Sequence, residues 1–65
     1  MNTLKNLYVE LAETDQKDTA RIAELERKAL SYEASLDVNT IREARNLARE
    51  ELAAKYNMVP WQVRL

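Results

Sequence analysis

Apolar residues recur at alternating intervals of four and three residues through the first half of this chain, which has 65 residues. The positions in this series are Leu4, Tyr8, Leu11, Asp15, Asp18, Ile22, Leu25, Ala29, Tyr32 and Leu36. Only the two aspartates are polar, and these intervals keep side chains on one face of an α-helix. The pattern therefore predicts one long helical stripe, or two stripes in the same phase, that must pack against other helices.

The chain is too short to bury a large core by itself. A domain of this size buries only about 60% of the surface of its unfolded chain. Disulfides and zinc stabilise many such small domains, but they need Cys or His, and the chain has neither. Association of copies is the remaining source of buried surface, so we predict a homodimer.

The residue types needed for catalysis and cofactor binding are missing. Without His or Cys, a nucleophile would be Ser or Thr activated by Lys or a carboxylate, and the sequence suggests no such arrangement around Ser31 or Ser35. The absence of Gly excludes phosphate-cradling loops, and no D-x-D-x-D-G loop for Ca²⁺ appears. We expect no enzymatic activity, no cofactor and no metal.

Charge and hydropathy bear on location and partners. The sequence has no signal-peptide pattern and no apolar run near the roughly 20 residues of a membrane span. The absence of Cys fits a reducing cytosol, so we expect a cytoplasmic protein. The net charge is −1, with eight acids and five bases in residues 1–39 and three acids and five bases in residues 40–65. The C-terminal part is therefore the more basic one.

The polar segment 13–18 decides how the first half is divided. It contains no apolar residue, so it is either a break, with Thr14 or Asp15 capping a second helix, or a polar turn inside one continuous helix. The preserved phase of the apolar stripe favours continuity. We expect a short or fused N-terminal helix at about 3–13 and a second helix at about 15–35.

The second helix carries the predicted seam between copies. Its members are Ile22, Leu25, Ala29, Tyr32 and Leu36. Glu24 and Lys28 form a favourable pair four residues apart. In a parallel dimer, Arg21 of one copy would face Glu26 of the other, and Lys28 would face Glu33. These pairs favour a dimeric, coiled-coil-like helical bundle.

A third helix is predicted over residues 41–56. Thr40 and Glu43 match the S/T-x-x-E capping box at its start, and Asn57 is a suitable left-handed residue after its end. Its apolar face consists of Ile41, Ala44, Ala48 and Leu52. The short connection to the preceding helix implies an antiparallel helical hairpin. We therefore predict one all-α domain over residues 1–65, with residues 57–65 as a tail.

Basic side chains form a stripe on the third helix. The stripe consists of Arg42, Arg45 and Arg49, with Tyr56 along the same line. It is a candidate strip for phosphates or for an acidic partner. Alternatively, these arginines pair with Glu26 or Glu33 of the preceding helix and cover the seam with their stems. We favour the second interpretation, above all for Arg45, because it borders the apolar face.

The C-terminal segment contains the most motif-like pattern in the chain. Residues 52–64 read LAAKYNMVPWQVR and resemble the helix-turn-helix of bacterial and phage DNA-binding proteins, which commonly reads L-A-x-x-[YF]-G-V-S-x-x-T-V-R. The matching positions are Leu52, Ala53, Tyr56 and Val63. Asn57 stands where Gly usually supplies a positive φ, and Met58 replaces the first hydrophobic residue of the turn.

The resemblance implies a DNA-binding function for the end of the chain. Pro60 would open the recognition helix, and Gln62 and Arg64 would face the DNA. Residues 60–65 give a recognition helix of about six residues, where about two to three turns fill a major groove. The chain is then either a fragment of a longer DNA-binding protein, or the likeness is only a helix followed by a turn and an apolar tail.

Trp61 and its neighbours allow two further interpretations of the tail. Val59, Trp61 and Val63 can seal the open end of the hairpin as a lid, which we favour because an exposed Trp is costly in so small a chain. Alternatively, the tail is a docking patch, since Trp and Arg are enriched at binding hot spots.

The expected function is that of a small non-enzymatic interaction or regulatory protein, of the kind that phages and mobile elements encode. It would bind another protein and itself, and the alternative is a DNA-binding transcriptional regulator that uses Gln62 and Arg64. The predicted partner-binding residues are Arg42, Arg45, Arg49, Tyr56, Trp61 and Arg64.

Overall fold

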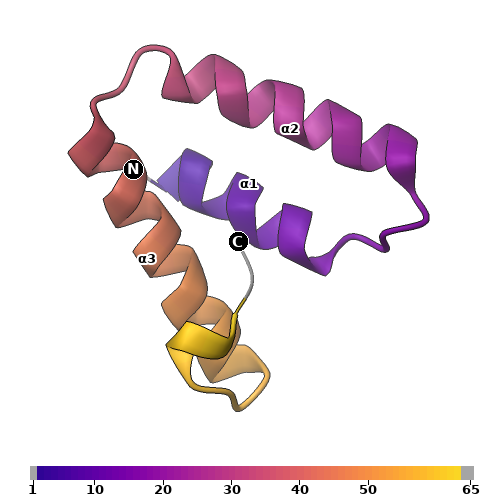
Figure 1. Cartoon of the computed structure of the whole chain (residues 1–65), viewed down its shortest axis with the longest axis vertical. Helices are drawn as coiled ribbons and strands as arrows, with labels where there is room; N and C mark the ends of the chain where they lie inside the picture. Colours follow the sequence, from indigo (N-terminus) through magenta and orange to yellow (C-terminus); the bar gives the residue numbers. More distant parts are fainter. Residues whose placement is uncertain (1, 64–65) are drawn as a thin grey trace.

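The computed structural model describes residues 2–63, and all of its regular secondary structure over this range is helical. It contains the α-helices α1 (Asn2–Glu13), α2 (Thr19–Glu33) and α3 (Val38–Lys55), followed by the 3₁₀ turn η1 (Pro60–Gln62) (Figure 1). The predicted all-α class is thus confirmed.

The first half of the chain is divided into two helices, so the predicted continuity through Asp15 and Asp18 is wrong. Residues 14–18 form a turn, and Asp18 caps α2 by accepting a hydrogen bond of 3.2 Å from the backbone N–H of Arg21. The predicted caps, Thr14 and Asp15, lie before it in the turn. A break forms here because the segment has nothing apolar to bury, while short polar side chains compete for backbone hydrogen bonds.

Helix α3 begins earlier than predicted, and its N-cap is Asp37 instead of Thr40. The Asp37 carboxylate accepts a 2.7 Å hydrogen bond from the backbone N–H of Thr40, which lies in the first turn of the helix. This bond lowers the pKa of Asp37, because it stabilises the charged carboxylate. The predicted Thr40–Glu43 capping box is therefore wrong: an Asp three residues upstream supplies the cap.

The predicted left-handed residue after α3 is confirmed. Asn57 has φ of 55°, and the backbone N–H of Met58 donates a 2.8 Å hydrogen bond to the carbonyl of Ala53. This bond across the helix end is typical of a Schellman motif. It reverses the chain, so that η1 packs back on α3.

The N-terminal helix is the centre of the packing. Helix α1 contacts both α2 and α3, and Figure 1 shows α1 and α2 running in opposite directions while α3 diverges from α2. The predicted side-by-side hairpin of α2 and α3 is not confirmed, because both helices pack mainly against α1 and make few contacts with each other. The result is a flat molecule with Cα dimensions of 32 × 30 × 15 Å.

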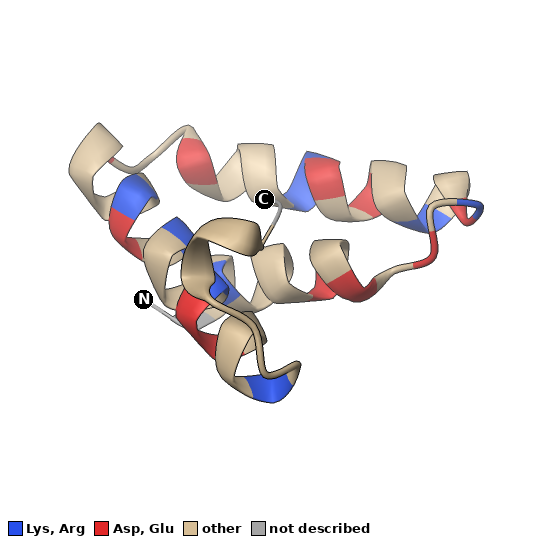
Figure 2. Ribbon diagram, turned by 60° about the horizontal axis from the view of Figure 1, so that its bottom comes forward, with Lys and Arg blue, Asp and Glu red and all other residues tan. Residues whose placement is uncertain are grey.

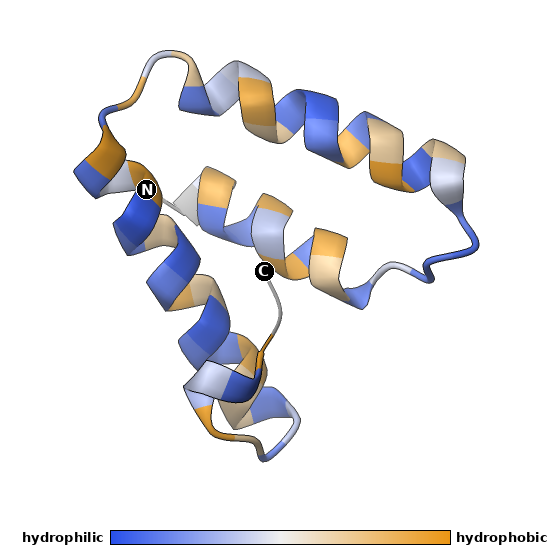
Figure 3. Cartoon of the chain, viewed as in Figure 1, coloured by the Kyte–Doolittle hydropathy of each residue, from blue (hydrophilic) through white to orange (hydrophobic). Residues whose placement is uncertain are grey.

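The core forms where α1 meets the other two helices. Its buried members are Leu4, Tyr8, Val9, Ala29, Ala44, Ala48 and Leu52. Ala48 is fully buried, so the small side chains on α3 allow α1 to approach closely. In Figure 3, apolar positions recur along all three helices between hydrophilic ones, as expected for helices with one buried face.

Much of the predicted seam between copies is buried by contacts within a single copy. Leu25 and Ala29 are buried by the fold of a single chain, and Ile22 and Leu36 are partly buried. Tyr32, in contrast, is 43% exposed. The sequence periodicity correctly predicted that Leu25 and Ala29 face other helices, but α1 of the same chain supplies part of the cover.

Replacing Ala48 with Leu should destabilise the fold by about 1–3 kcal/mol, because the larger side chain does not fit the close contact between α1 and α3. The matched control is Ala54→Leu, which places the same side chain at an exposed position of α3. Chemical denaturation followed by circular dichroism measures both. Equal free energies of unfolding for the two variants would contradict the close packing at Ala48.

Candidate interaction surface

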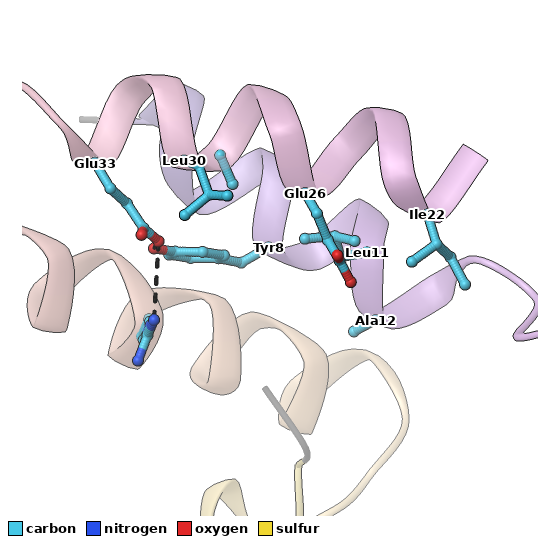
Figure 4. A pocket seen from close by; sticks show the side chains of 9 residues that line it. Tyr8, Leu11, Ala12, Ile22, Glu26, Leu30 and Glu33 are labelled. Carbon is cyan, nitrogen blue, oxygen red and sulfur yellow. Dashed lines mark hydrogen bonds and ion pairs between the residues drawn. The ribbon is translucent and has the colours of Figure 1, made fainter. Parts of the chain in front are cut away.

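Three side chains from three helices meet where the helices converge (Figure 4). The hydroxyl of Tyr8 in α1 donates a hydrogen bond to the carboxylate of Glu33 in α2. The guanidinium of Arg45 in α3 lies 3.8 Å from the same carboxylate and 5.6 Å from the centre of the Tyr8 ring. The Tyr8–Glu33–Arg45 cluster thus joins all three helices, and the predicted pairing of Arg45 with Glu33 is confirmed.

The cluster also fixes the charge state of its tyrosine. Burial raises the pKa of Tyr8, and the hydrogen bond to the Glu33 carboxylate raises it further. A phenol is already protonated at neutral pH, and the raised pKa extends to higher pH the range over which Tyr8 can donate to Glu33. No sequence pattern predicted this role for Tyr8 beyond its place in the apolar stripe.

A groove of about 510 Å³ runs beside this cluster, between α1 and α2. We call it the acidic groove; its lining consists of Tyr8, Leu11, Ala12, Ile22, Glu26, Ala29, Leu30, Glu33 and Arg45. Figure 4 shows Ile22, Glu26 and Leu30 projecting from α2 along one side, with Leu11 and Ala12 opposite. Glu26 forms no ion pair with any residue between 2 and 63.

A second groove, of about 420 Å³, lies along α3. We call it the basic groove; its lining consists of Val38, Ile41, Arg42, Arg45, Asn46 and Arg49. All three predicted arginines are therefore brought together. Arg49 donates a 3.3 Å hydrogen bond to the side-chain oxygen of Asn46, and neither Arg49 nor Arg42 has an ion pair with the described residues. The favoured pairing with Glu26 or Glu33 is therefore wrong for these two arginines.

Tyr56 is engaged within the chain, at the far end of α3 from Arg42. Its hydroxyl donates a 2.7 Å hydrogen bond to the carboxylate of Glu13 in α1, which also accepts from the ammonium group of Lys55. The hydrogen bond from Lys55 has the largest effect in lowering the pKa of Glu13, and the hydrogen bond from Tyr56 lowers it further. The bond to Glu13 in turn raises the pKa of Tyr56. This cluster ties the C-terminal ends of α1 and α3 together.

Trp61 does not seal the molecule, so the favoured lid interpretation is wrong for this residue. Its side chain is 81% exposed, while Val63 packs against the core in its place. Met58 and Val59 are exposed as well, and we call these three residues the tail patch. Gln62 is also exposed, and Arg64 lies outside the described residues.

The described part of the chain, residues 2–63, contains no group of three or more His, Cys, Asp or Glu side chains placed to hold a metal ion. Over the same range, no helix has the length and apolar character needed to cross a bilayer. Comparisons with protein-family models, with curated proteins and with solved structures gave no match.

Acidification should weaken the tie between α1 and α3. Because the pKa of Glu13 in the folded chain lies below its ordinary value of 4.5, its contribution to stability is complete above pH 4.5 and is lost as the pH falls further. Glu13→Gln should therefore flatten the dependence of the melting temperature on pH in this range. Asp37 titrates in the same direction in both proteins, so the difference between them isolates Glu13.

The control for this experiment is Glu50→Gln, which removes an exposed carboxylate that forms no ion pair with residues 2–63. Its profile should follow the wild-type profile. If Glu13→Gln and Glu50→Gln have the same pH profile, the Glu13 carboxylate does not hold the two helices together.

Proposed function

We propose that this chain is a small non-enzymatic interaction or regulatory protein, of the kind that phages and mobile elements encode, which acts in the cytoplasm by binding another protein and by self-association. The exposed Trp61 is the observation that carries the proposal. A tryptophan side chain has a large apolar area and is among the residues most enriched at binding hot spots. Leaving it in water is unfavourable unless a partner covers it.

The backbone around Trp61 supports a preorganised docking element. The N–H of Gln62 donates to the carbonyl of Val59 at 3.0 Å, and the N–H of Val63 donates to that of Pro60 at 3.1 Å. Val63 in turn packs on the core. A side chain held on an ordered turn loses little further freedom on binding, which favours affinity.

The composition of this segment favours a protein partner. Residues 56–63 contain no charged residue, and Figure 2 shows the turn η1 without Lys, Arg, Asp or Glu. Met58 and Val59 add apolar surface beside Trp61. An uncharged patch of this kind suits an apolar pocket or groove on another protein, whereas a nucleic-acid surface requires cations.

The total exposed surface supports self-association. The chain exposes 4825 Å², whereas a monomeric protein of 7.6 kDa exposes about 4,300 Å² on average. Leu30 and Val38 are the two most exposed aliphatic side chains among the described residues, at 65% and 68%.

Trp61→Ala should weaken capture of a protein partner by about 30-fold or more, the effect of losing a hot-spot side chain, while leaving the melting temperature nearly unchanged. Pull-down from a lysate of the native host identifies the partner, and titration with that purified partner measures the affinity. Trp61 is the only tryptophan in the chain, so its fluorescence should shift to shorter wavelength on binding.

Leu47→Ala is the control, because it truncates an exposed apolar residue of α3 outside the tail patch. It should bind the partner like the wild type. If Trp61→Ala unfolds the chain, Trp61 has a structural role; if it folds and binds normally, the tail patch is not the docking site.

DNA binding is the second candidate, and the turn after α3 supports it. Asn57 has the positive φ that a helix-turn-helix turn requires, and Leu52 and Ala53 are buried as in that motif. The described part of the second helix, however, is only the turn η1. A DNA-binding protein would lose affinity for duplex DNA steeply with rising salt, and Arg42→Glu or Arg64→Glu would abolish binding. The absence of duplex binding at moderate salt would exclude this candidate.

A further inference from the structure

The geometry points to a second copy of this chain as the occupant of the adjoining acidic and basic grooves, in a two-fold dimer in which the acidic groove of each copy faces the basic groove of the other. This inference rests on the self-association proposed above and assigns its surface and symmetry. The partner surface is the same pair of grooves on the other copy.

The two grooves adjoin each other, because Arg45 lines both of them. On one side of Arg45, the acidic groove presents the carboxylate of Glu26, which lacks an ion pair within residues 2–63. On the other side, the basic groove presents Arg42 and Arg49 and no carboxylate. The acidic groove thus carries a negative charge without an ion pair among the described residues, and the basic groove carries positive charges.

A surface with two halves of opposite charge is complementary to a copy of itself. In a two-fold dimer, each residue i that contacts residue j of the partner is matched by j contacting i. If the axis lies between the two grooves, the acidic groove of each copy faces the basic groove of the other. Glu26 of each chain then lies near Arg42 and Arg49 of its partner, and both contacts are attractive.

Apolar contacts are available in both halves of this surface. Leu30 is 65% exposed in the acidic groove, and Val38 is 68% exposed in the basic groove. The floor of the acidic groove is apolar, with Leu11, Ala12 and Ala29. A standard interface buries about 800 Å² on each partner, roughly a sixth of the 4825 Å² that this chain exposes.

The parallel seam predicted from the sequence is less suited to the same role. Three of its four charges are bound within the chain: Arg21 lies 2.8 Å from Glu10, Lys28 lies 3.3 Å from Glu24, and Glu33 is held by Tyr8 and Arg45. Leu25, a central seam residue, is buried as well. Pairing along that seam would require the chain to give up these contacts, whereas the adjoining grooves are available without rearrangement.

Charge reversal tests the proposed contacts. In a dimer of the Glu26→Arg variant, Arg at position 26 faces Arg42 and Arg49 of the partner at both symmetry-related contacts. In a dimer of the Arg42→Glu/Arg49→Glu variant, Glu26 faces two carboxylates at both contacts, so both variants bring like charges together. Each should raise the dimer dissociation constant by about tenfold or more. A mixture of the two variants should form a heterodimer of wild-type affinity, because both contacts become attractive again. Sedimentation and native mass spectrometry measure these states.

The matched controls carry the same charge changes outside the grooves. They are Glu50→Arg for the single reversal and Lys17→Glu/Arg27→Glu for the double one; these residues are exposed and lie outside both grooves. They should dimerise like the wild type and should not form preferential heterodimers. Melting curves check that every variant is folded, which is expected because the altered side chains are outside the core.

Three results would overturn the inference. If the wild type dimerises but the groove variants behave like their controls, self-association stands and this surface is wrong. If the groove variants are weakened but their mixture does not recover, Glu26 does not face the basic groove across a two-fold axis. If the wild type stays monomeric at the highest soluble concentration, the self-association proposed above fails together with this inference, whereas partner binding through Trp61 is unaffected.

Discussion

The packing of α1 against both longer helices is the interaction on which the rest of the structure depends. Helix α1 contributes Leu4, Tyr8 and Val9 to the core, and the core residues of α2 and α3 belong to the same cluster as these three side chains. Full burial of one such side chain contributes about 1.5–3 kcal/mol, which is large beside the marginal stability of a small domain. Without α1, the long helices would have little to hold them, since α2 and α3 make few direct contacts.

Polar contacts then fix how the helices are arranged around α1. The Tyr8–Glu33–Arg45 cluster joins all three helices at one point, and Glu13 ties the end of α1 to Lys55 and Tyr56 at the end of α3. Exposed ion pairs add little stability individually, but these contacts also determine which charged side chains remain free to contact another molecule. They engage Glu33 and Tyr56, and among residues 2–63 they leave Glu26, Arg42 and Trp61 free at the surface. The proposed partner binding uses Trp61, and the proposed dimer uses Glu26 and Arg42.

The sequence predicted local features well where a single residue type carries the physical reason. Asn57 adopts the positive φ expected of it, and the Glu24–Lys28 pair forms at 3.3 Å. Arg45 pairs with Glu33, as its place beside the apolar face suggested. Predictions failed where several nearby residues could each cap the same helix. Asp18 and Asp37 are the caps of α2 and α3, whereas other residues were expected to cap them. Several short polar side chains in a row can each supply a cap, and the choice depends on how the helices pack.

The sequence by itself determined that this chain is helical and which faces of its helices are apolar, because side chains three and four residues apart lie on one face whatever the helix packs against. Only the tertiary structure decided what covers those faces: the turn at residues 14–18 brings α1 back along α2, so part of the stripe predicted to join two copies is buried within one. It also decided that Val63 and not Trp61 packs on the core. Periodicity fixes the direction of a side chain relative to its own helix, whereas the direction of one helix relative to another depends on turns and contacts between residues far apart in the sequence.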